Sequence, residues 1–299
     1  MKNTFKRPAG LLVAGLLLAG VAYSPVFAAD TKQSEKPKVE AAKKTDAAKK
    51  EYSLRDLNEQ LIMATLWVQT SAEYRALCRQ TYNTVRMALD KDLAEVKTDK
   101  KRIIILDGDE TTLQANLYEA YIIGIDKEYP VGWYEWVADA KSIPIPGAAE
   151  LLNYAASKGV EPYYVTNRKI DKEYQGTLDD LKKNGFPFAD PEHVVYRQVG
   201  QPDNKLQRQL DLVAKYHLVA YVGDDLNDFP LGTHGKTLEE RNKAMEDAKD
   251  EWGRKYFMLP NPMYGSWEKT LKNNKVGLPA AEQDQMRRAY LRRWEPSKK

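Results

Sequence analysis

The sequence has few of the side chains that form disulfides or bind soft metal ions. Only one of its 299 residues is cysteine, Cys78, and only three are histidine. One cysteine cannot form an intrachain disulfide, and neither a four-cysteine nor a two-cysteine, two-histidine metal site can be built around it. Cys78 lies on an apolar helical stripe, so we expect it to be buried packing. Any bound metal is therefore expected to have oxygen ligands.

Long apolar runs are also scarce, and the one that exists lies near the N-terminus. Lys2, Lys6 and Arg7 precede an apolar run over residues 9–22, and small or apolar residues follow as far as Ala28. This order is typical of a secretory signal peptide cleaved after Ala28, which predicts a periplasmic or secreted protein. A single membrane anchor is the alternative, but the run is shorter than the roughly 20 residues that a bilayer span needs. The segment has no cysteine, so we expect no lipid anchor.

Charge of one sign is in excess only because of that segment. The full chain has a formal net charge of +3, and residues 1–28 carry three basic residues and no acidic ones, so cleavage leaves a formal net charge of 0. We therefore expect neither a nucleic-acid polymer nor a polybasic membrane contact. Residues 29–52 are mostly Lys, Ala, Glu, Asp and Thr, with too few large apolar side chains to order themselves. They are interpreted as a disordered charged tether.

The rest of the chain has the patterns of a folded α/β protein. Apolar residues at helical spacing predict two or more helices within 53–99. Three short apolar runs follow, each ending in polar residues: 103–106, 163–165 and 219–222. Amphipathic segments at 148–157 and 205–216 precede the second and third runs, which predicts a parallel sheet with helices on both faces. Ligands bind at the carboxyl ends of such strands, so the polar residues should meet at one edge.

These polar residues include an unusual number of aspartates. Asp107 and Asp109 lie two apart just after the first run, where their like charges need a cation to offset them. Mg²⁺ commonly takes one or two carboxylates and leaves room for water and a substrate phosphate. Asp224, Asp225 and Asp228 follow the third run and offer more oxygen ligands.

The same residue types suit phosphoryl transfer. An aspartate beside Mg²⁺ can attack phosphorus, while a second aspartate protonates the leaving alcohol and later activates water. Thr166 and Asn167 could donate hydrogen bonds to the phosphoryl oxygens, and Lys205 could neutralise developing charge. Each piece alone is more ordinary, because Asp and Gly at strand ends often form turns or helix caps. Their occurrence together, in this order, is much more specific.

The order of carboxylate pair, Thr-Asn, Lys and Gly-Asp with a further Asp resembles the signature of haloacid-dehalogenase-type phosphohydrolases. The flanking sequence resembles the bacterial class C acid phosphatases, the so-called DDDD group. The matching blocks extend over most of the mature chain: 67–74, 145–148, 164–168, 177–181 and 257–267.

The resemblance implies a role for each matching residue. Asp107 corresponds to the nucleophile and a Mg²⁺ ligand, and Asp109 to the general acid and base, with its backbone carbonyl on the metal. Asp224 corresponds to the third protein ligand of the metal. Thr166 corresponds to the phosphate-binding threonine, with Asn167 beside it, and Lys205 to the charge-neutralising lysine.

Further positions match the surroundings of the family's site. Asp228 corresponds to the fourth signature aspartate, behind the metal ligands, and Asp225 lies in the same loop. Aromatic residues near the family's site stack on a nucleoside or aryl leaving group, and the matching positions are Trp133, Trp136 and Tyr264. The alternative for each aromatic is ordinary core packing.

Two departures from the family's pattern bear on activity. Gly108 stands where Ile or Leu is usual, and it is expected to loosen the loop that carries both aspartates. Asp225 stands where Asn or Thr is usual, and it is expected to add a negative charge beside the metal. The main hypothesis is an exported, Mg²⁺-dependent acid phosphatase that hydrolyses phosphate monoesters, with nucleotides among them, through an aspartyl-phosphate. The alternative is a catalytically weak phospholigand-binding surface protein on the same fold.

The expected architecture is a parallel α/β sheet of the Rossmann-like type seen in haloacid dehalogenases, with a smaller, mainly helical cap. The expected segments are a signal peptide (1–28), a tether (29–52), N-terminal helices that form part of the cap (53–99), a phosphatase core (100–262) with a cap insert at about 117–142, and a C-terminal segment (263–299). The expected partner is a small phosphomonoester. Members of the family are often oligomeric, so a homo-oligomer stays an open expectation.

Overall fold

The computed structural model describes residues 51–296. The expected signal peptide, and the tether but for its last two residues, lie outside the described residues. Within the described range, no helix combines the length and the apolar character that crossing a bilayer requires.

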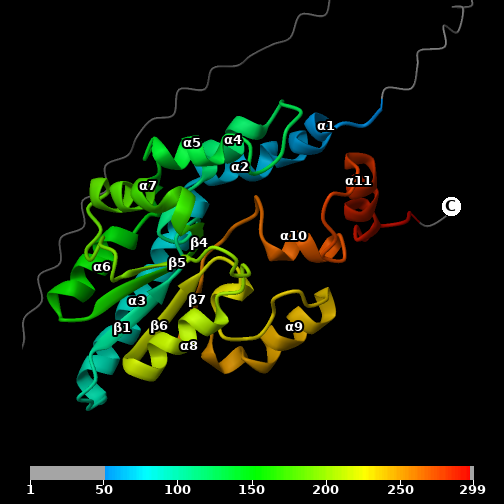
Figure 1. The fold of residues 1–299 in the computed structure, drawn as a ribbon. Coiled ribbons are helices and arrows are strands. Elements are labelled where there is room, and N and C mark those ends of the chain that lie inside the picture. The colour runs from blue at the N-terminus through cyan, green and yellow to red at the C-terminus, as the bar shows by residue number, and fades with distance from the viewer. Residues whose placement is uncertain (1–50, 297–299) are drawn as a thin grey trace, which may run out of the picture. The chain divides into compact units, whose positions relative to one another are not determined.

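A five-stranded parallel sheet forms the centre of the described region (Figure 1). Its strands are β1 (Arg102–Leu106), β4 (Glu161–Lys169), β5 (Val194–Arg197), β6 (His217–Gly223) and β7 (Tyr256–Met258). They lie in the order β5-β4-β1-β6-β7, and every neighbouring pair is parallel. The three predicted apolar runs are β1, β4 and β6, the three central strands. The predicted α/β fold class is confirmed.

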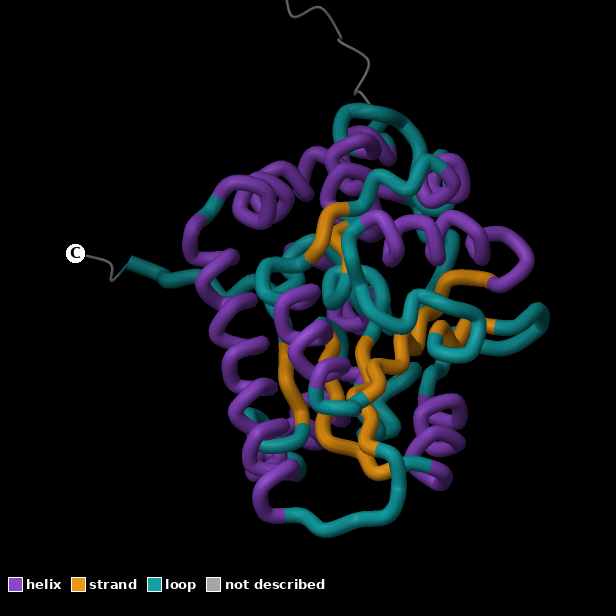
Figure 2. Tube along the Cα trace, turned by 90° about the vertical axis from the view of Figure 1, so that its left-hand side faces the viewer, coloured by secondary structure: helices purple, strands orange, loops and turns teal. Residues whose placement is uncertain are grey.

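Helices cover both faces of this sheet, as Figure 2 shows from the side. The larger core cluster joins the sheet to α3 (Ala72–Glu95), α6 (Ala148–Ser157) and α7 (Ile170–Lys183). A second cluster joins the other face to α8 (Leu206–Lys215). Buried on both sides, β1 consists of apolar residues after its first position, and Cys78 of α3 is fully buried as expected.

A small helical cap lies above the carboxyl edge of the sheet (Figure 1). The hairpin of β2 (Leu113–Gln114) and β3 (Ile143–Pro144) encloses α4 (Asn116–Ile122) and α5 (Trp133–Ala138), where the insert at about 117–142 was expected. The cap has its own apolar cluster, built around Tyr118, Trp133 and Val137.

The N-terminal helices divide between cap and core. The short α1 (Leu54–Asn58) and α2 (Ile62–Thr70) lie with the cap, and the Gln69 side chain donates to the backbone oxygen of Asn116 in α4 (3.2 Å). In contrast, α3 packs on the sheet, whereas the N-terminal helices of 53–99 are expected from the sequence to lie with the cap. The reason is its stripe of large apolar residues, including Tyr74, Tyr82 and Leu89, which needs the larger core to bury it.

The C-terminal part adds α9 (Leu238–Asp247), α10 (Ser266–Leu271) and α11 (Ala280–Ala289). Helix α11 returns to the start of the described chain, where the Gln60 side chain donates to Asp284 (2.6 Å). Short 3₁₀ turns occupy Glu59–Leu61, Leu226–Asp228 and Lys249–Glu251.

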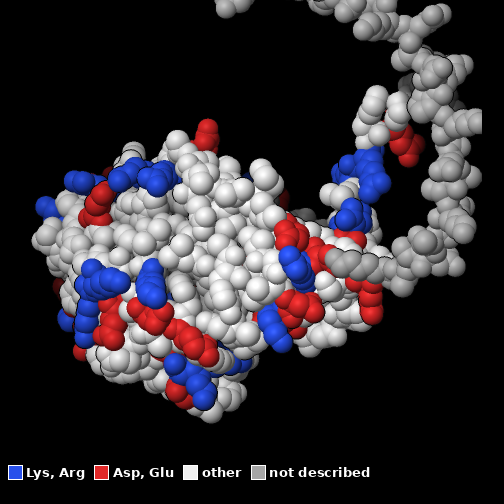
Figure 3. All heavy atoms as spheres, turned by 90° about the horizontal axis from the view of Figure 1, so that it is seen from above, with Lys and Arg blue, Asp and Glu red and all other residues white. Residues whose placement is uncertain are grey.

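The face seen from above has uncharged side chains over much of its centre and mixed positive and negative groups around its rim (Figure 3). Among the cap helices, exposed apolar residues include Met63 and Leu66 of α2 and Leu117 and Tyr121 of α4. No single sign of charge dominates this view.

Cap and core meet closely where α5 crosses α7. A Cβ atom added to Gly176 of α7 would lie 2.2 Å from the backbone oxygen of Val137, far inside van der Waals contact. The backbones of the two helices therefore approach as closely as only a glycine permits.

We expect Gly176→Ala to destabilise the fold by about 1–3 kcal/mol, because the clash outweighs the gain in helix propensity. Urea unfolding measures this change, with Gln175→Ala on the exposed side of the same helix as the matched control. An unchanged unfolding midpoint for Gly176→Ala would show that the two helices can separate freely.

Candidate active site

Residues distant in the sequence meet at the carboxyl edge of the sheet. Asp107 directly follows β1, Thr166 lies in β4, and Asp224 directly follows β6. One carboxylate oxygen each from Asp107, Asp224 and Asp228 lies within 4.8 Å of the others. The parallel order of the strands thus produces a cluster of three carboxylates.

Lys205 is the cation of this cluster. It lies at the N-terminal end of α8, its side chain is almost fully buried, and its Nζ donates to Oδ1 of both Asp107 and Asp228, the latter at 2.7 Å. The other oxygen of Asp228 accepts from the backbone N–H groups of Asp224 (3.2 Å) and Asp225 (2.9 Å). Asp228 therefore holds both the lysine and the loop that carries Asp224.

One ammonium does not balance three buried carboxylates. Burial raises the pKa of Asp107 to about 7, although Lys205 lowers it. Burial raises the pKa of Asp224 well above its ordinary range, and the charges of Asp228 and Asp107 add to the rise. The cluster is short of positive charge.

A hard divalent cation fits this deficit, because every side-chain donor of the cluster is a carboxylate oxygen. Asp224 is already oriented, since its two oxygens accept from Thr111 Oγ1 (2.9 Å) and Asn261 Nδ2 (3.0 Å). Asp107 and Asp224 are the residues that would hold such an ion, with Asp228 next to them.

Asp109 has a different partner. Its carboxylate accepts three hydrogen bonds from the guanidinium of Arg168, at 2.7 to 3.2 Å. Arg168 is buried and also donates to Thr177 Oγ1 (3.2 Å), and its Nη1 lies 3.8 Å from Asp180. Asp109 is thus fixed beside the carboxylate cluster and separate from its lysine.

The predicted phosphate-binding residues are held by a second arginine. Arg208 of α8 donates to the backbone oxygen of Thr166 (2.5 Å) and to Oδ1 of Asn167 (2.6 Å). Thr166 Oγ1 accepts from the backbone N–H of Arg168 (3.1 Å). Thr166 lies at the carboxyl edge with Asp107, and the Asn167 amide is oriented by Arg208.

The three predicted aromatic residues have different surroundings. Trp133 is buried in the cap, and its Nε1 donates to Glu173 (2.5 Å). These are the surroundings of a core residue. Trp136 is half-buried, and none of the described residues hydrogen-bonds its indole nitrogen. Both rings lie within 6 Å of the Arg168 guanidinium, at 5.8 and 5.7 Å. Tyr264 is half-buried against the larger core cluster.

The two departures behave differently from what the sequence suggests. Gly108 is buried, its carbonyl accepts the backbone N–H groups of Thr112 and Leu113, and a Cβ there would lie 3.0 Å from Thr166 Oγ1. The loop is therefore packed and hydrogen-bonded, not loosened. A glycine allows this close approach to β4.

The Asp225 side chain has partners outside the carboxylate cluster. Its side chain accepts hydrogen bonds from the backbone and hydroxyl of Ser266 and lies 3.4 Å from Arg241. Burial alone would raise the pKa of Asp225, but these contacts outweigh burial and lower it. The carboxylate anchors the start of α10, and its negative charge still acts on the cluster, since it adds to the rise in the pKa values of Asp224 and Asp228.

Two residues at the site were not assigned a role from the sequence. Arg168 follows Thr166 by two positions in a strand, so both side chains lie on the same face, and this spacing could have revealed it. Glu119 of α4 is buried and gives no such signal. Burial raises the pKa of Glu119 to about 7, and the charge of Asp109 adds to the rise.

The raised pKa of Glu119 makes the stability of the fold depend on pH. The folded chain holds this proton more tightly than the unfolded chain, so the contribution to stability is full below about pH 4.5 and is lost as the pH rises through about 7. Glu119→Gln should therefore be more stable than the unchanged chain by about 3 kcal/mol at pH 8 and close to it at pH 4.5.

Chemical denaturation at several pH values measures this difference. The matched control is Glu135→Gln, on the exposed side of α5. A constant difference across the pH range would contradict the raised pKa.

Comparisons with known proteins agree with this geometry. The family model of the HAD superfamily, subfamily IIIB (acid phosphatase), matches residues 28–267. The fold is similar to that of the class C acid phosphatase from Bacillus anthracis, with 38% sequence identity over 80% of this chain and 99% of that chain and a TM-score of 0.75. A structure of the class C acid phosphatase from the same organism with tungstate bound gives 36% identity, the same coverage and a TM-score of 0.76.

The family match spans more than half of the chain, and the structural likeness covers 80% of it. The chain therefore belongs to the acid phosphatases of HAD subfamily IIIB, which are phosphomonoester hydrolases.

Proposed function

We propose that this acid phosphatase is exported, depends on Mg²⁺, and works through an aspartyl-phosphate on Asp107. The observation that carries the proposal is the contrast between Asp107 and Asp109, the two aspartates that follow β1. Asp107 lies in the carboxylate cluster with Lys205, whereas Asp109 lies beside it on Arg168. The two aspartates therefore have different surroundings, and we assign attack on phosphorus to Asp107 and proton transfer to Asp109.

In the first step, an oxygen of Asp107 attacks phosphorus and the bond from phosphorus to the ester oxygen breaks. The proton of Asp109 passes to the departing alcohol, and Asp109 is left ionised against Arg168. Lys205 and the Thr166 hydroxyl would stabilise the charge that develops on the phosphoryl oxygens. A bound Mg²⁺ would supply further positive charge at the phosphoryl group.

In the second step, Asp109 takes a proton from water, and the water oxygen attacks the phosphorus of the aspartyl-phosphate. The bond from phosphorus to Asp107 breaks, which releases phosphate and restores both carboxyl groups. The cap aromatics above Arg168 would limit the entry of other water and would contact the leaving group. Nucleotides and aryl phosphates are the leaving-group classes that Trp136 and Tyr264 would suit.

Other findings support parts of the proposal. The related structure with bound tungstate supports an oxyanion site, since tungstate is a tetrahedral oxyanion like phosphate. The sequence pattern of residues 1–28 supports export, to the periplasm or the medium. The hydrogen-bonded loop at Gly108 and the Ser266 contacts of Asp225 favour an active enzyme over the alternative of a catalytically weak binding protein.

The direct test is release of p-nitrophenol from its phosphate ester by the mature chain at acidic pH. We expect turnover with Mg²⁺, loss of turnover with excess chelator, and recovery when Mg²⁺ is restored. Asp107→Asn should reduce kcat by at least about a thousandfold with an unchanged melting temperature, because an amide cannot act as the nucleophile. Turnover that survives in Asp107→Asn would contradict the assignment of the nucleophile.

The pairing of Arg168 with Asp109 gives a second test. Arg168→Lys keeps the charge but cannot form the same forked contact, so Asp109 loses its fixed position. We expect kcat/KM to fall by about ten- to a hundredfold for an alkyl phosphate and by less for p-nitrophenyl phosphate. The reason is that p-nitrophenolate departs as the anion, so its departure does not depend on a proton from Asp109.

Steady-state kinetics with both substrates measures this difference, with Arg79→Lys at the exposed pair with Glu150 as the control. An equal loss for both leaving groups would indicate that Arg168 supports the fold and does not position the acid.

A further inference from the structure

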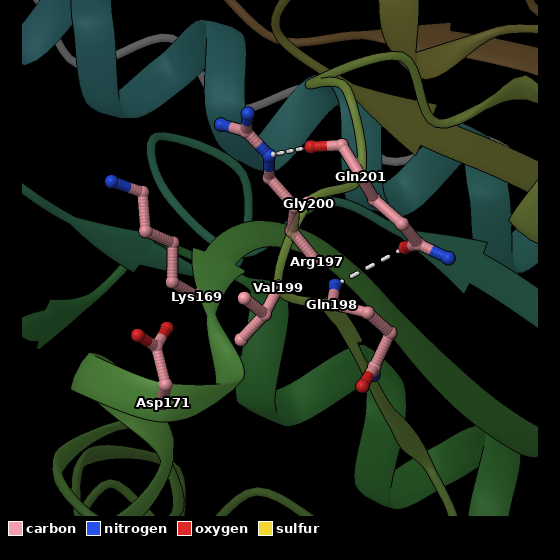
Figure 4. Close-up of a pocket in the computed structure, with 7 residues that line it drawn as sticks. All are labelled: Lys169, Asp171, Arg197, Gln198, Val199, Gly200 and Gln201. Atoms are coloured by element: carbon pink, nitrogen blue, oxygen red, sulfur yellow. Dashed lines mark hydrogen bonds between the residues drawn. The ribbon is translucent and has the colours of Figure 1, made fainter.

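A basic pocket lies beside the active site and has no part in the mechanism above. It has a volume of about 320 Å³ and is lined by Lys169, Asp171, Arg197 and the loop 198–201 (Figure 4). Lys169 is the last residue of β4 and Arg197 the last residue of β5, and the two are paired across the strands. The pocket therefore opens at the same edge of the sheet as Thr166 and Arg168.

Both cations have donors to spare. The Lys169 ammonium donates to the Tyr134 hydroxyl of α5 (3.0 Å), and Arg197 Nε donates to the backbone oxygen of Gln201 (2.7 Å). Among residues 51–296, no acceptor contacts the terminal nitrogens of Arg197, and Lys169 keeps further ammonium protons. Figure 4 shows these terminal nitrogens pointing away from the loop, in the same general direction as the Lys169 side chain.

The loop that positions Arg197 is braced by its own hydrogen bonds. The backbone N–H of Gln201 donates to the Gln198 oxygen (3.0 Å), and the Gln201 side-chain oxygen accepts from the Gln198 backbone N–H (3.1 Å). Because Arg197 uses only its Nε on this loop, the flat end of its guanidinium is presented to the pocket. That end is the part that suits a phosphate oxygen pair.

The one carboxylate in the lining does not cancel both cations. Asp171 is exposed and forms no ion pair with Lys169 or Arg197 within the described range. It lies in the first turn of α7, where an acidic side chain interacts well with the helix dipole. Two cations against one carboxylate leave the pocket with a positive charge.

The positive charge continues from the pocket to the phosphoryl site. Arg208 contacts the backbone of Thr166, and the charge of Arg197 reaches it, since burial and Arg197 together lower the pKa of Arg208 to about 10. Arg208, Arg197 and Lys169 thus form a series of cations along the edge formed by β4 and β5, and Lys205 precedes Arg208 by three residues at the start of α8. A substrate with one anionic group needs only the inner part of this series.

We propose that the pocket of Lys169 and Arg197 binds a second phosphate group of the substrate, so that phosphomonoesters carrying another phosphate are a preferred class. The inference rests on the proposed function, because the first phosphate must occupy the site at Asp107. Tyr134 of the cap contacts Lys169, so a second phosphate would also lie against the cap and help to select the leaving group.

Calorimetric titration of the Mg²⁺-loaded mature chain tests this without turnover. The ligands are alkyl monophosphonates and alkane bisphosphonates with spacers of two to six methylene groups, which have no bond that the enzyme can hydrolyse. We expect at least one bisphosphonate to bind about tenfold tighter than the monophosphonate of equal length. The double substitution Lys169→Gln and Arg197→Gln should reduce this ratio to about one.

Matched variants sharpen the result. Lys172→Gln removes an exposed cation of α7 outside the pocket and should leave the ratio of bisphosphonate to monophosphonate affinity unchanged. Asp171→Asn should increase the ratio, because it removes the opposing charge. Phosphonocarboxylates of the same lengths form a further arm, and we expect them to gain less than the bisphosphonates.

Two outcomes would overturn the proposal: a wild-type chain that binds no bisphosphonate more tightly than a monophosphonate, or an advantage that survives the double substitution. Both concern binding. A chain that shows the ratio but does not hydrolyse p-nitrophenyl phosphate would instead overturn the proposed function, so the two failures are distinguishable.

Discussion

The contact of the Lys205 ammonium with Asp107 and Asp228 is the interaction on which the site depends. Buried carboxylates are tolerated only with a compensating charge, and this lysine is the only cation in direct contact with the three-aspartate cluster among the described residues. The arrangement requires β1 beside β6 and α8 directly after the β5 edge, which is the observed topology. The fold itself therefore holds Lys205 and the three aspartates of the cluster in place.

A second constraint keeps the two proposed catalytic residues, Asp107 and Asp109, in different environments. Asp107 contacts Lys205, which also contacts Asp228, and has further carboxylates nearby. Asp109 instead accepts hydrogen bonds from the buried Arg168, which lies close to the cap aromatics. Two carboxylates two residues apart can take different roles only if their surroundings differ in this way. The cap takes part because Asp180, which lies near Arg168, also accepts from the backbone and hydroxyl of Ser142 at the end of the insert.

The sequence predicts the central part of this structure well and its edges poorly. Strands β1, β4 and β6 are buried on both faces and appear as continuous apolar runs, and the helix expected at 148–157 has those bounds. The edge strands β5 and β7 have four and three residues, too few for a recognisable pattern. The aspartates, Thr166 and Lys205 could be identified because strand ends of a parallel sheet converge.

What the sequence could not supply were side-chain partners that lie far along the chain. The direction of Asp225 depends on Ser266, 41 residues later, and the packing of Gly108 depends on Thr166 in another strand. The division of 53–99 between cap and core depends on which surface buries α3. Such outcomes follow from tertiary contacts and not from local pattern. In contrast, the two-residue spacing from Thr166 could have placed Arg168 at the site.

The most direct test of the account is the location of the phosphoryl group in enzyme quenched with acid during turnover. Peptide mapping by mass spectrometry after rapid quenching, with hydroxylamine to detect an acyl phosphate, identifies the residue that carries it. The account predicts a transient, hydroxylamine-sensitive phosphoryl group on the peptide that contains Asp107, which disappears as substrate is exhausted. A phosphoryl group on a different residue would contradict it.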